Sequence, residues 1–377
     1  PEGERFFTST FLHTPGQTPG LRDGIAHAVY GGLYGKDYPK AIEGHVRTGE
    51  LMPALVELGA AAPSGLACLA STQLLPPELA GQRTLVAALF NLQKVTAHRL
   101  RPAGASFTTD TRDLVIADRI DFHPTDVLED ADGSLLIVDT GGWYDLCCPS
   151  SRIDQKTAAG GIYRLSRIAS SDAGQPVLTR ETNGAAETAA TIDPAIIVQH
   201  LIDARPWVAR RAQLQLLDLA NPADGSTEEG QASSDIDATA TKLLPRSSGS
   251  RVDLRLATEI IATTTSSLEQ QMSDSSLELN KRLTCLWGLC TIGNPRALAA
   301  ISQQLSGPHD SLVQAAGHAV SLHRYAAAKP QLEHLLQHTN LQVRRVAAEG
   351  LGRIGDSISA RKLLASLDTN APYDRHW

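Results

Sequence analysis

The sequence predicts a multidomain chain that is first all-β and then all-α. It is expected to be a partial β-propeller, contributing the last two or three blades, followed by an α-solenoid. Three observations lead to this fold class. Residues 1–168 hold short β-type runs between Gly and Pro turns, the apolar period becomes helical from about residue 194, and one apolar pattern near the C-terminal end returns every 31 residues.

The β-type runs are each about as long as a strand and are separated by turn residues. Pro63 and Pro124 open two similar series about 60 residues apart, which suits successive four-stranded blades with long loops. A propeller protects its strand edges by closing into a ring, so we expect the missing blades upstream in a longer chain. The first 60 residues are Gly-rich and irregular, and predict an inter-blade loop or a partial blade. In chain order, the expected strands are residues 63–71, 83–91, 94–102, 113–122, 124–130, 133–141 and 160–167.

The helical part is expected at residues 194–377, after a linker at 169–193. Residues 204–220 carry apolar side chains at helical spacing. Residues 221–250 are rich in Ser, Asp, Gly and Thr, a composition that predicts a flexible insertion. The side chains of the first segment that are expected in the core are those of Trp207, Val208, Leu214 and Leu217.

Repeated helical units follow this insertion. Leu289, Val320 and Leu351 are 31 residues apart, and Arg282 and Arg344 also match across two repeats. A single helical hairpin cannot bury its apolar face, so neighbouring hairpins are expected to stack. The motif VRRVAAEGLGRIGD resembles HEAT repeats. This resemblance implies a HEAT-like solenoid that contacts a protein partner or an electron-carrier domain.

Composition and charge exclude several classes of protein. The formal net charge is -7 and no long basic block occurs, which argues against a nucleic-acid partner. No apolar run is long enough to span a membrane. The five cysteines show no C-x-x-C spacing, so neither a zinc site nor a c-type haem attachment is predicted. These features leave the cellular compartment of the chain undetermined.

Asp130 and Asp132 precede a glycine and suggest a calcium loop at first sight. An EF-hand loop needs a glutamate at its twelfth position, which here is Gly141, and it continues into a helix. The residues after Asp132 alternate as a strand does. The pattern therefore favours an Asp-Gly turn between two strands, with no metal site.

The remaining candidates are His45, His123, Asp126 and the adjacent pair Cys147 and Cys148. Both histidines stand in a loop or at the start of a strand, positions that a propeller places near its central channel. Neither has a local partner that identifies a base or a ligand. The cysteine pair beside a proline predicts ordinary loop thiols, with redox or metal chemistry as the alternative.

The run from Phe122 to Arg167, followed by HEAT-like helices, resembles the membrane-bound dehydrogenase family of planctomycete-type bacteria. That family combines HEAT repeats with a propeller similar to those of glucose and sorbosone dehydrogenases. Trp143, Tyr144, Cys147 and Cys148 form the loop that carries the family signature. The resemblance implies oxidation of a sugar or alcohol in the periplasm or at the cell surface, with PQQ and calcium as cofactors of the parent protein.

Two functions from different classes follow. In the first, the chain is a fragment of a quinoprotein-type dehydrogenase. The catalytic histidine of such enzymes lies in an earlier blade, so the fragment alone is expected to be inactive. His123 also stands where the family phrase has arginine. In the second, propeller and solenoid are both binding surfaces, for a polysaccharide or for protein partners, without turnover.

Overall fold

The structure of the chain is a computed structural model. It divides the chain into two compact units, which we call the β-HEAT unit (Pro1–Gly174, Arg205–Trp207 and Gln304–Trp377) and the helical unit (Gln175–Ala204 and Val208–Gln303). The β-HEAT unit thus includes residues of both predicted domains. The described residues are 2–10, 12, 21–35, 44, 46, 49–69, 83–119, 121–130, 132–141, 159–166, 193–203, 205–221 and 254–367.

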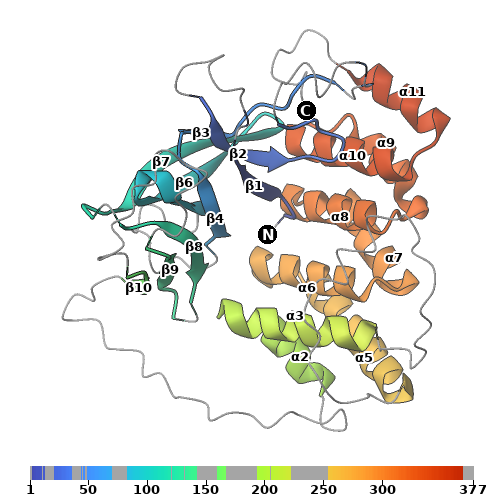
Figure 1. The fold of residues 1–377 in the computed structure, drawn as a ribbon. Coiled ribbons are helices and arrows are strands. Elements are labelled where there is room, and N and C mark those ends of the chain that lie inside the picture. The colour runs from blue at the N-terminus through green and yellow to red at the C-terminus, as the bar shows by residue number, and fades with distance from the viewer. Residues whose placement is uncertain are drawn as a thin grey trace, which may run out of the picture. The chain divides into compact units, whose positions relative to one another are not determined.

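Three antiparallel sheets form the β part of the β-HEAT unit, and none of them closes on itself (Figure 1). The first sheet has the order β1-β2-β3, the second β4-β5-β6-β7 and the third β8-β9-β10, so strands adjacent in sequence are adjacent in space. The strands are β1 (Arg5–Ser9), β2 (Asp23–Ala28), β3 (Val56–Gly59), β4 (Pro63–Cys68), β5 (Thr84–Leu89), β6 (Lys94–Ala103), β7 (Ser106–Ile116), β8 (Pro124–Glu129), β9 (Leu135–Asp139) and β10 (Gly161–Leu165).

The second sheet lies between the other two, and β5 shows why. All six residues of β5 are buried, and successive side chains of a strand point to opposite faces. Val86 and Ala88 pack into one cluster with residues of the third sheet, including Val127 and Ile137. The alternate residues of β5 pack into a second cluster with Ile25 and Val56 of the first sheet. The run from Leu85 to Leu89 is therefore apolar at every position, because both faces of β5 are covered.

The prolines that open the two predicted series begin neighbouring strands of different sheets. Ser64 of β4 donates a hydrogen bond to the backbone oxygen of Pro124 at 3.1 Å. A Cβ atom on Gly65 would lie 2.6 Å from the Cα atom of Asp126, so only glycine permits this approach. The repeated Pro-x-x phrase thus marks the place where the second and third sheets meet.

For the first 60 residues, the sequence left an inter-blade loop or a partial blade as alternatives. The structure has strands there, β1, β2 and β3, which form a three-stranded sheet. These strands are short, and β2 and β3 are far apart in the sequence, so local alternation gave little signal. The predicted strand at 113–122 also differs, because β7 starts at Ser106 and ends at Ile116. Turn residues Gly104 and Ala105 join β6 and β7 into one long hairpin.

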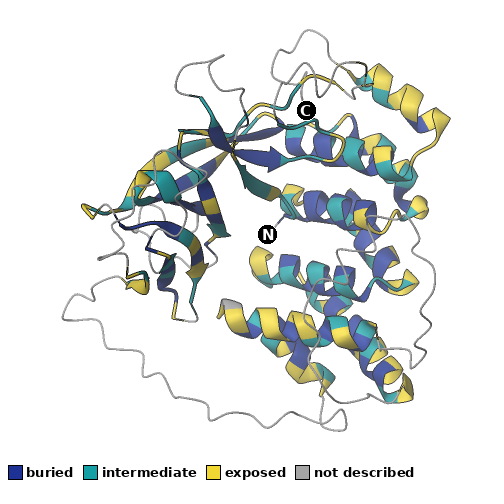
Figure 2. Cartoon of the chain, in the orientation of Figure 1, coloured by how far each residue is buried: buried dark blue, intermediate teal, exposed yellow. Residues whose placement is uncertain are grey.

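The helices of the β-HEAT unit follow η4 (Gln304–Ser306) and are interrupted by η5 (Ala326–Ala328). Asn340 and Asp356 begin the last two helices as N-caps, with side chains that accept backbone N–H groups. In Figure 2 the first and third of these helices carry a continuous buried stripe, whereas the last is mostly exposed. The helices are α8 (Asp310–Leu322), α9 (Lys329–Leu335), α10 (Leu341–Ile354) and α11 (Ser357–Ser366).

The helical unit is built from a second group of helices. Gly288 of α6 allows Leu268 of α5 and Leu201 of α2 to pack closely, because no Cβ atom stands between them. Gly293 then ends α6 in the left-handed conformation, as glycine does at many helix ends. The helices are α2 (Pro194–Leu201), α3 (Pro206–Ala220, whose first two residues belong to the β-HEAT unit), α5 (Leu254–Ser273), α6 (Leu279–Ile292) and α7 (Pro295–Gln303).

The predicted core positions of the repeats are confirmed, whereas those of residues 204–220 are confirmed only in part. Leu289, Val320 and Leu351 are all buried, as the 31-residue pattern predicts. In α3, Trp207 and Leu214 are exposed. Val208 is buried as predicted, and Leu217 is half-buried. The other buried side chains of α3 are those of Ala212, Leu216 and Leu219.

The two arginines that match across the repeats lie in different surroundings. Arg282 is buried and donates from Nε to the backbone oxygen of Met272 at 2.8 Å. Arg344 is only half-buried, and the buried arginine of α10 is its neighbour Arg345. The predicted linker, apart from Asp193, and the predicted insertion, apart from Asn221, lie outside the described residues. None of the helices in the described segments combines the length and apolar character that a membrane crossing requires.

Candidate functional site

His123 and Asp126, two of the sequence candidates, lie at the start of β8 but are not brought together. His123 is 2% exposed, and its ring lies 4.6 Å from the ring of Phe90. Its Nδ1 atom is buried and has no hydrogen-bond partner within the described segments. Asp126 is exposed, and its Oδ1 atom accepts the N–H of Val127 at 2.9 Å. Among the described residues, therefore, these two side chains do not form an acid–base pair.

Asp130 and Asp132 lie in the turn between β8 and β9. Asp132 Oδ1 accepts the backbone N–H of Ser134 at 2.9 Å, and Gly133 has a φ of 77°. The guanidinium of Arg164 pairs with Asp130 at 2.6 Å and with Asp132 at 3.1 Å. Both carboxylates thus pair with Arg164 at the turn of this hairpin. Within the described residues, no group of three or more His, Cys, Asp or Glu side chains is arranged to hold a metal ion.

Asp139 has a structural part in the same hairpin. Its Oδ1 atom accepts the backbone N–H of His123 at 2.8 Å and that of Gly141 at 2.9 Å. The carboxylate therefore fixes the start of β8 against the end of β9. The other sequence candidates, His45, Trp143, Tyr144, Cys147 and Cys148, lie outside the described residues.

A buried polar cluster, which sequence reasoning missed, joins the sheets to α8 and α10. We call it the Glu4 hub. Glu4 precedes β1, and its side chain is 2% exposed. Its Oε2 atom lies 2.5 Å from Nε2 of His27 on β2, and its Oε1 atom bonds to Arg345 of α10 and Gln314 of α8. His318 of α8 lies 3.4 Å from the same oxygen.

Arg345 carries the positive charge of the hub, and its side chain is 1% exposed. Its Nη1 atom pairs with Glu349 one turn along α10, and its Nε atom donates to the backbone oxygen of Ala105 at 2.7 Å. Gln342 of α10 donates to the backbone oxygen of Ser106 at 2.8 Å. The hairpin turn between β6 and β7 is thereby fixed to α10 by side chains that reach its carbonyl groups.

The hub determines the charge state of Glu4. Burial alone raises the pKa of this carboxyl, but hydrogen bonds from His27 and His318 and the charge of Arg345 outweigh burial and hold the pKa well below its usual range. Glu4 is therefore ionised at neutral pH. A buried ion pair of this kind contributes little net stability, but removing one partner leaves an uncompensated charge. The hub thus fixes how the sheets and helices of this unit fit together.

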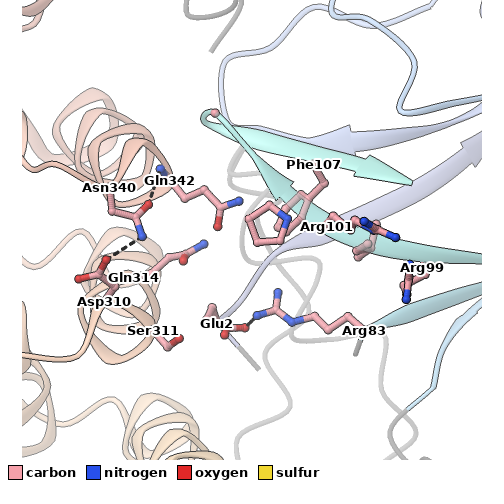
Figure 3. A pocket seen from close by; sticks show the side chains of 13 residues that line it. Glu2, Arg83, Arg99, Arg101, Phe107, Asp310, Ser311, Gln314, Asn340 and Gln342 are labelled. Atoms are coloured by element: carbon pink, nitrogen blue, oxygen red, sulfur yellow. Dashed lines mark hydrogen bonds and ion pairs between the residues drawn. The ribbon is translucent and has the colours of Figure 1, made fainter. Parts of the chain in front are cut away.

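A polar pocket of about 680 Å³ lies beside the hub, within the β-HEAT unit (Figure 3). Arginines form one wall: Arg83 precedes β5, while Arg99 and Arg101 are on β6. The opposite wall comes from the first residues of α8 and α10 and carries side-chain amides. Phe107, Leu100 and Pro102 supply apolar surface. The amide side chains are those of Gln314, Asn340 and Gln342.

The charges of the pocket are only partly compensated. Three arginines and two carboxylates, Glu2 and Asp310, line the pocket, and Arg99 and Arg101 share a third carboxylate, that of Asp110 on β7. Arg83 pairs with Glu2, and burial lowers the pKa of Arg83 to about 10, which leaves it charged at neutral pH. The N-termini of α8 and α10 add partial positive charge. The pocket therefore favours ligands that bring negative charge.

The fold and the site define a protein in which open antiparallel sheets and HEAT repeats form one compact unit around a polar pocket. Residues 302–377 match the family described as HEAT repeats. No curated protein matches the chain.

Among solved structures, the chain is similar to one described as the complex of CpcE and CpcF of phycocyanin lyase from a Nostoc species. The identity is 16% and the TM-score 0.31. The match covers 52% of this chain and 65% of that chain, so this chain spans less than two thirds of its length. A similarity of this size indicates no shared function.

Proposed function

We propose that the chain is a binding scaffold for a protein partner, which it recognises through the polar pocket of the β-HEAT unit. The observation that supports this most is the construction of the pocket. Its two walls come from a sheet and from HEAT-type helices, and the Glu4 hub holds them together through buried contacts. A preformed pocket loses little entropy on binding, which favours recognition. HEAT-type solenoids commonly serve as binding surfaces.

The chemistry of the pocket supports binding over turnover. Its described lining holds arginine, amide and carboxylate side chains but no histidine, cysteine or lysine. Arginine stays protonated and acts as an anion-binding group, not as a base. Of the sequence candidates, His123 is buried behind Phe90, at a different place in the fold. The second function derived from the sequence, without turnover, is therefore the one that this geometry favours.

Blocking the pocket tests this proposal. Ser311 lines the pocket near the start of α8, and a Ser311→Trp substitution places an indole ring in it. Ser306→Trp is the matched control, because Ser306 is exposed and does not line the pocket. We expect the immobilised wild-type chain and the control to capture the same partner from extracts of cells that make the protein. Ser311→Trp is expected to reduce capture at least about tenfold, as loss of a binding hot spot does. Equal capture by the two variants would show that the partner is not recognised through this pocket.

A second candidate is the dehydrogenase fragment, with a propeller domain ending near residue 168 and helical repeats from 194. The observation that favours it is the order of the sheets, because three successive meanders stack side by side, as blades do. In this proposal the parent protein lies in the periplasm or at the cell surface, binds PQQ and calcium, and oxidises a sugar or alcohol. The intact parent, loaded with calcium, is then expected to bind PQQ and to reduce a dye with sugar. Absence of PQQ binding would end this proposal.

A further inference from the structure

The arginine wall of the pocket is incompletely neutralised by its own partner. Arg99 and Arg101 are two residues apart on β6, so both side chains lie on the same face of the strand. Both guanidinium groups bond to Asp110 of β7. Arg99 uses its Nε atom, at 3.0 Å, and its Nη2 atom, while Arg101 uses its Nη2 atom. All three bonds end on one oxygen, Oδ2.

One carboxylate oxygen is a poor partner for three donors, because it offers only two lone pairs. Arg101 is the arginine that can turn to another acceptor, since its side chain is 56% exposed whereas that of Arg99 is 14% exposed. Within the described residues, Arg101 makes this single hydrogen bond, which leaves its other N–H groups facing solvent and the pocket. A planar guanidinium with free donors suits a carboxylate, which it binds through two parallel hydrogen bonds.

The helix wall offers the complementary groups of a peptide chain. Gln342 and Gln314 each use their Nε2 atom inside the protein, on Ser106 and Glu4 respectively. Their Oε1 atoms accept no hydrogen bond from the described residues, and both side chains line the pocket (Figure 3). An amide oxygen is the usual acceptor for a backbone N–H group. One wall thus provides donors for carboxylates and the other provides acceptors for peptide N–H groups.

We propose that this pocket binds an acidic peptide segment of the partner, with a glutamate or aspartate side chain on Arg101 and the peptide backbone on Gln342 and Gln314. This proposal rests on the proposed function and names the chemistry of the partner. The volume of about 680 Å³ suits a few residues of an extended chain, within the usual range of ligand pockets. Phe107 receives the aliphatic part of the acidic side chain. Arg101, which shares one oxygen of Asp110 with Arg99, supplies the complementary charge.

A titration with a defined probe tests the inference. The probe is the fluorescein-labelled peptide Gly-Ala-Glu-Ala-Glu-Ala-Gly, and its counterpart has glutamine in place of both glutamates. Binding to the full chain is measured by fluorescence anisotropy at low salt. We expect the glutamate peptide to bind and the glutamine peptide to bind much more weakly. Arg101→Gln is expected to weaken the glutamate peptide about 10- to 100-fold, because a charge-assisted hydrogen bond is lost. Arg101→Lys is expected to recover only part of this loss, since lysine keeps the charge without the planar fork.

The matched control is Arg112→Gln, which removes the same charge from an exposed residue of β7 that does not line the pocket. Equal weakening by Arg101→Gln and Arg112→Gln would show non-specific attraction and overturn the proposal. The proposal would also be overturned if the chain bound an oligogalacturonate, an acidic saccharide, but did not bind the glutamate peptide. If Ser311→Trp abolishes partner capture while the glutamate peptide fails to bind, the pocket function stands and the acidic-peptide proposal falls. If the peptide binds while capture is insensitive to Ser311→Trp, the pocket binds acidic peptides, but the proposed function falls and the peptide is not a segment of the captured partner.

Discussion

Replacement of Arg345 by methionine is expected to lower the free energy of unfolding of the β-HEAT unit by about 3–5 kcal/mol, the usual cost of breaking a buried ion pair from one side. Methionine keeps much of the aliphatic stem but leaves the Glu4 carboxylate buried without its guanidinium. The backbone oxygen of Ala105 also loses its donor. For a unit of this size we expect the midpoint of thermal unfolding to fall by about 6–20 °C, at about 2–4 °C per kcal/mol.

Calorimetry of the full chain measures this change, and two further variants make it specific. Arg344→Met removes the neighbouring, half-buried arginine from the same helix and is expected to shift the midpoint far less. Adding Glu4→Gln to Arg345→Met is expected to restore part of the lost stability, because a neutral amide needs no counter-charge. If Arg345→Met unfolded at the same temperature as Arg344→Met, the Glu4 hub would not hold this unit together.

The sequence predicted those strands and buried positions that depend on patterns among residues close together in the chain. The alternation and turn residues between Pro63 and Leu165 predicted strands that the structure contains, because β4 to β10 pair with their neighbours along the chain. The 31-residue spacing found Leu289, Val320 and Leu351 because a repeated hairpin buries the same position each time. The match to HEAT repeats at 302–377 agrees with that prediction.

The Glu4 hub lay beyond such patterns. Glu4 and Arg345 are 341 residues apart, and neither forms a motif with its neighbours. One signal was present in α10, where Gln342, Arg345 and Glu349 fall on one side of the helix at spacings of three and four. Polar side chains aligned beside the apolar face of a helix indicate that this side of the helix contacts polar groups of another element. The repeat alignment instead selected Arg344, because it compared residue types and not helix faces.

The pocket was equally hidden from the sequence, because its walls come from distant segments. The sequence around Arg99 and Arg101 predicts only a strand, and the sequence around Gln342 predicts only a helical repeat. Their function arises when the turn between β6 and β7 docks on α10. The histidines drew attention instead, because histidine is the residue most often associated with chemistry. Among the described histidines, His98 is the one whose pKa burial clearly lowers.

His98 of β6 is expected to make the β-HEAT unit less stable as the pH falls from about 6.5 to 4. Its ring is fully buried between the hydroxyl groups of Thr96 and Thr111, at 2.8 and 2.9 Å. Burial lowers the pKa of His98 from 6.5 to about 4, and the negative charge of Asp113 opposes this only in part. The unfolded chain therefore takes up a proton at higher pH than the folded chain does. The stability contributed by neutral His98 is present above pH 6.5 and is lost as the pH falls towards 4.

At about 1.4 kcal/mol for each pKa unit, this shift corresponds to a loss of up to about 3 kcal/mol across that interval. We expect His98→Gln to be less stable at pH 7 but to lose far less of its stability between pH 6.5 and 4. Urea unfolding of the full chain at a series of pH values measures the slope. His309→Gln is the matched control, because His309 is exposed and is expected to leave the slope unchanged. An unchanged slope in His98→Gln would show that His98 is not the source of the pH dependence. Glu4 itself acts at lower pH, because the stability of a carboxylate with a lowered pKa is lost only below its unfolded pKa.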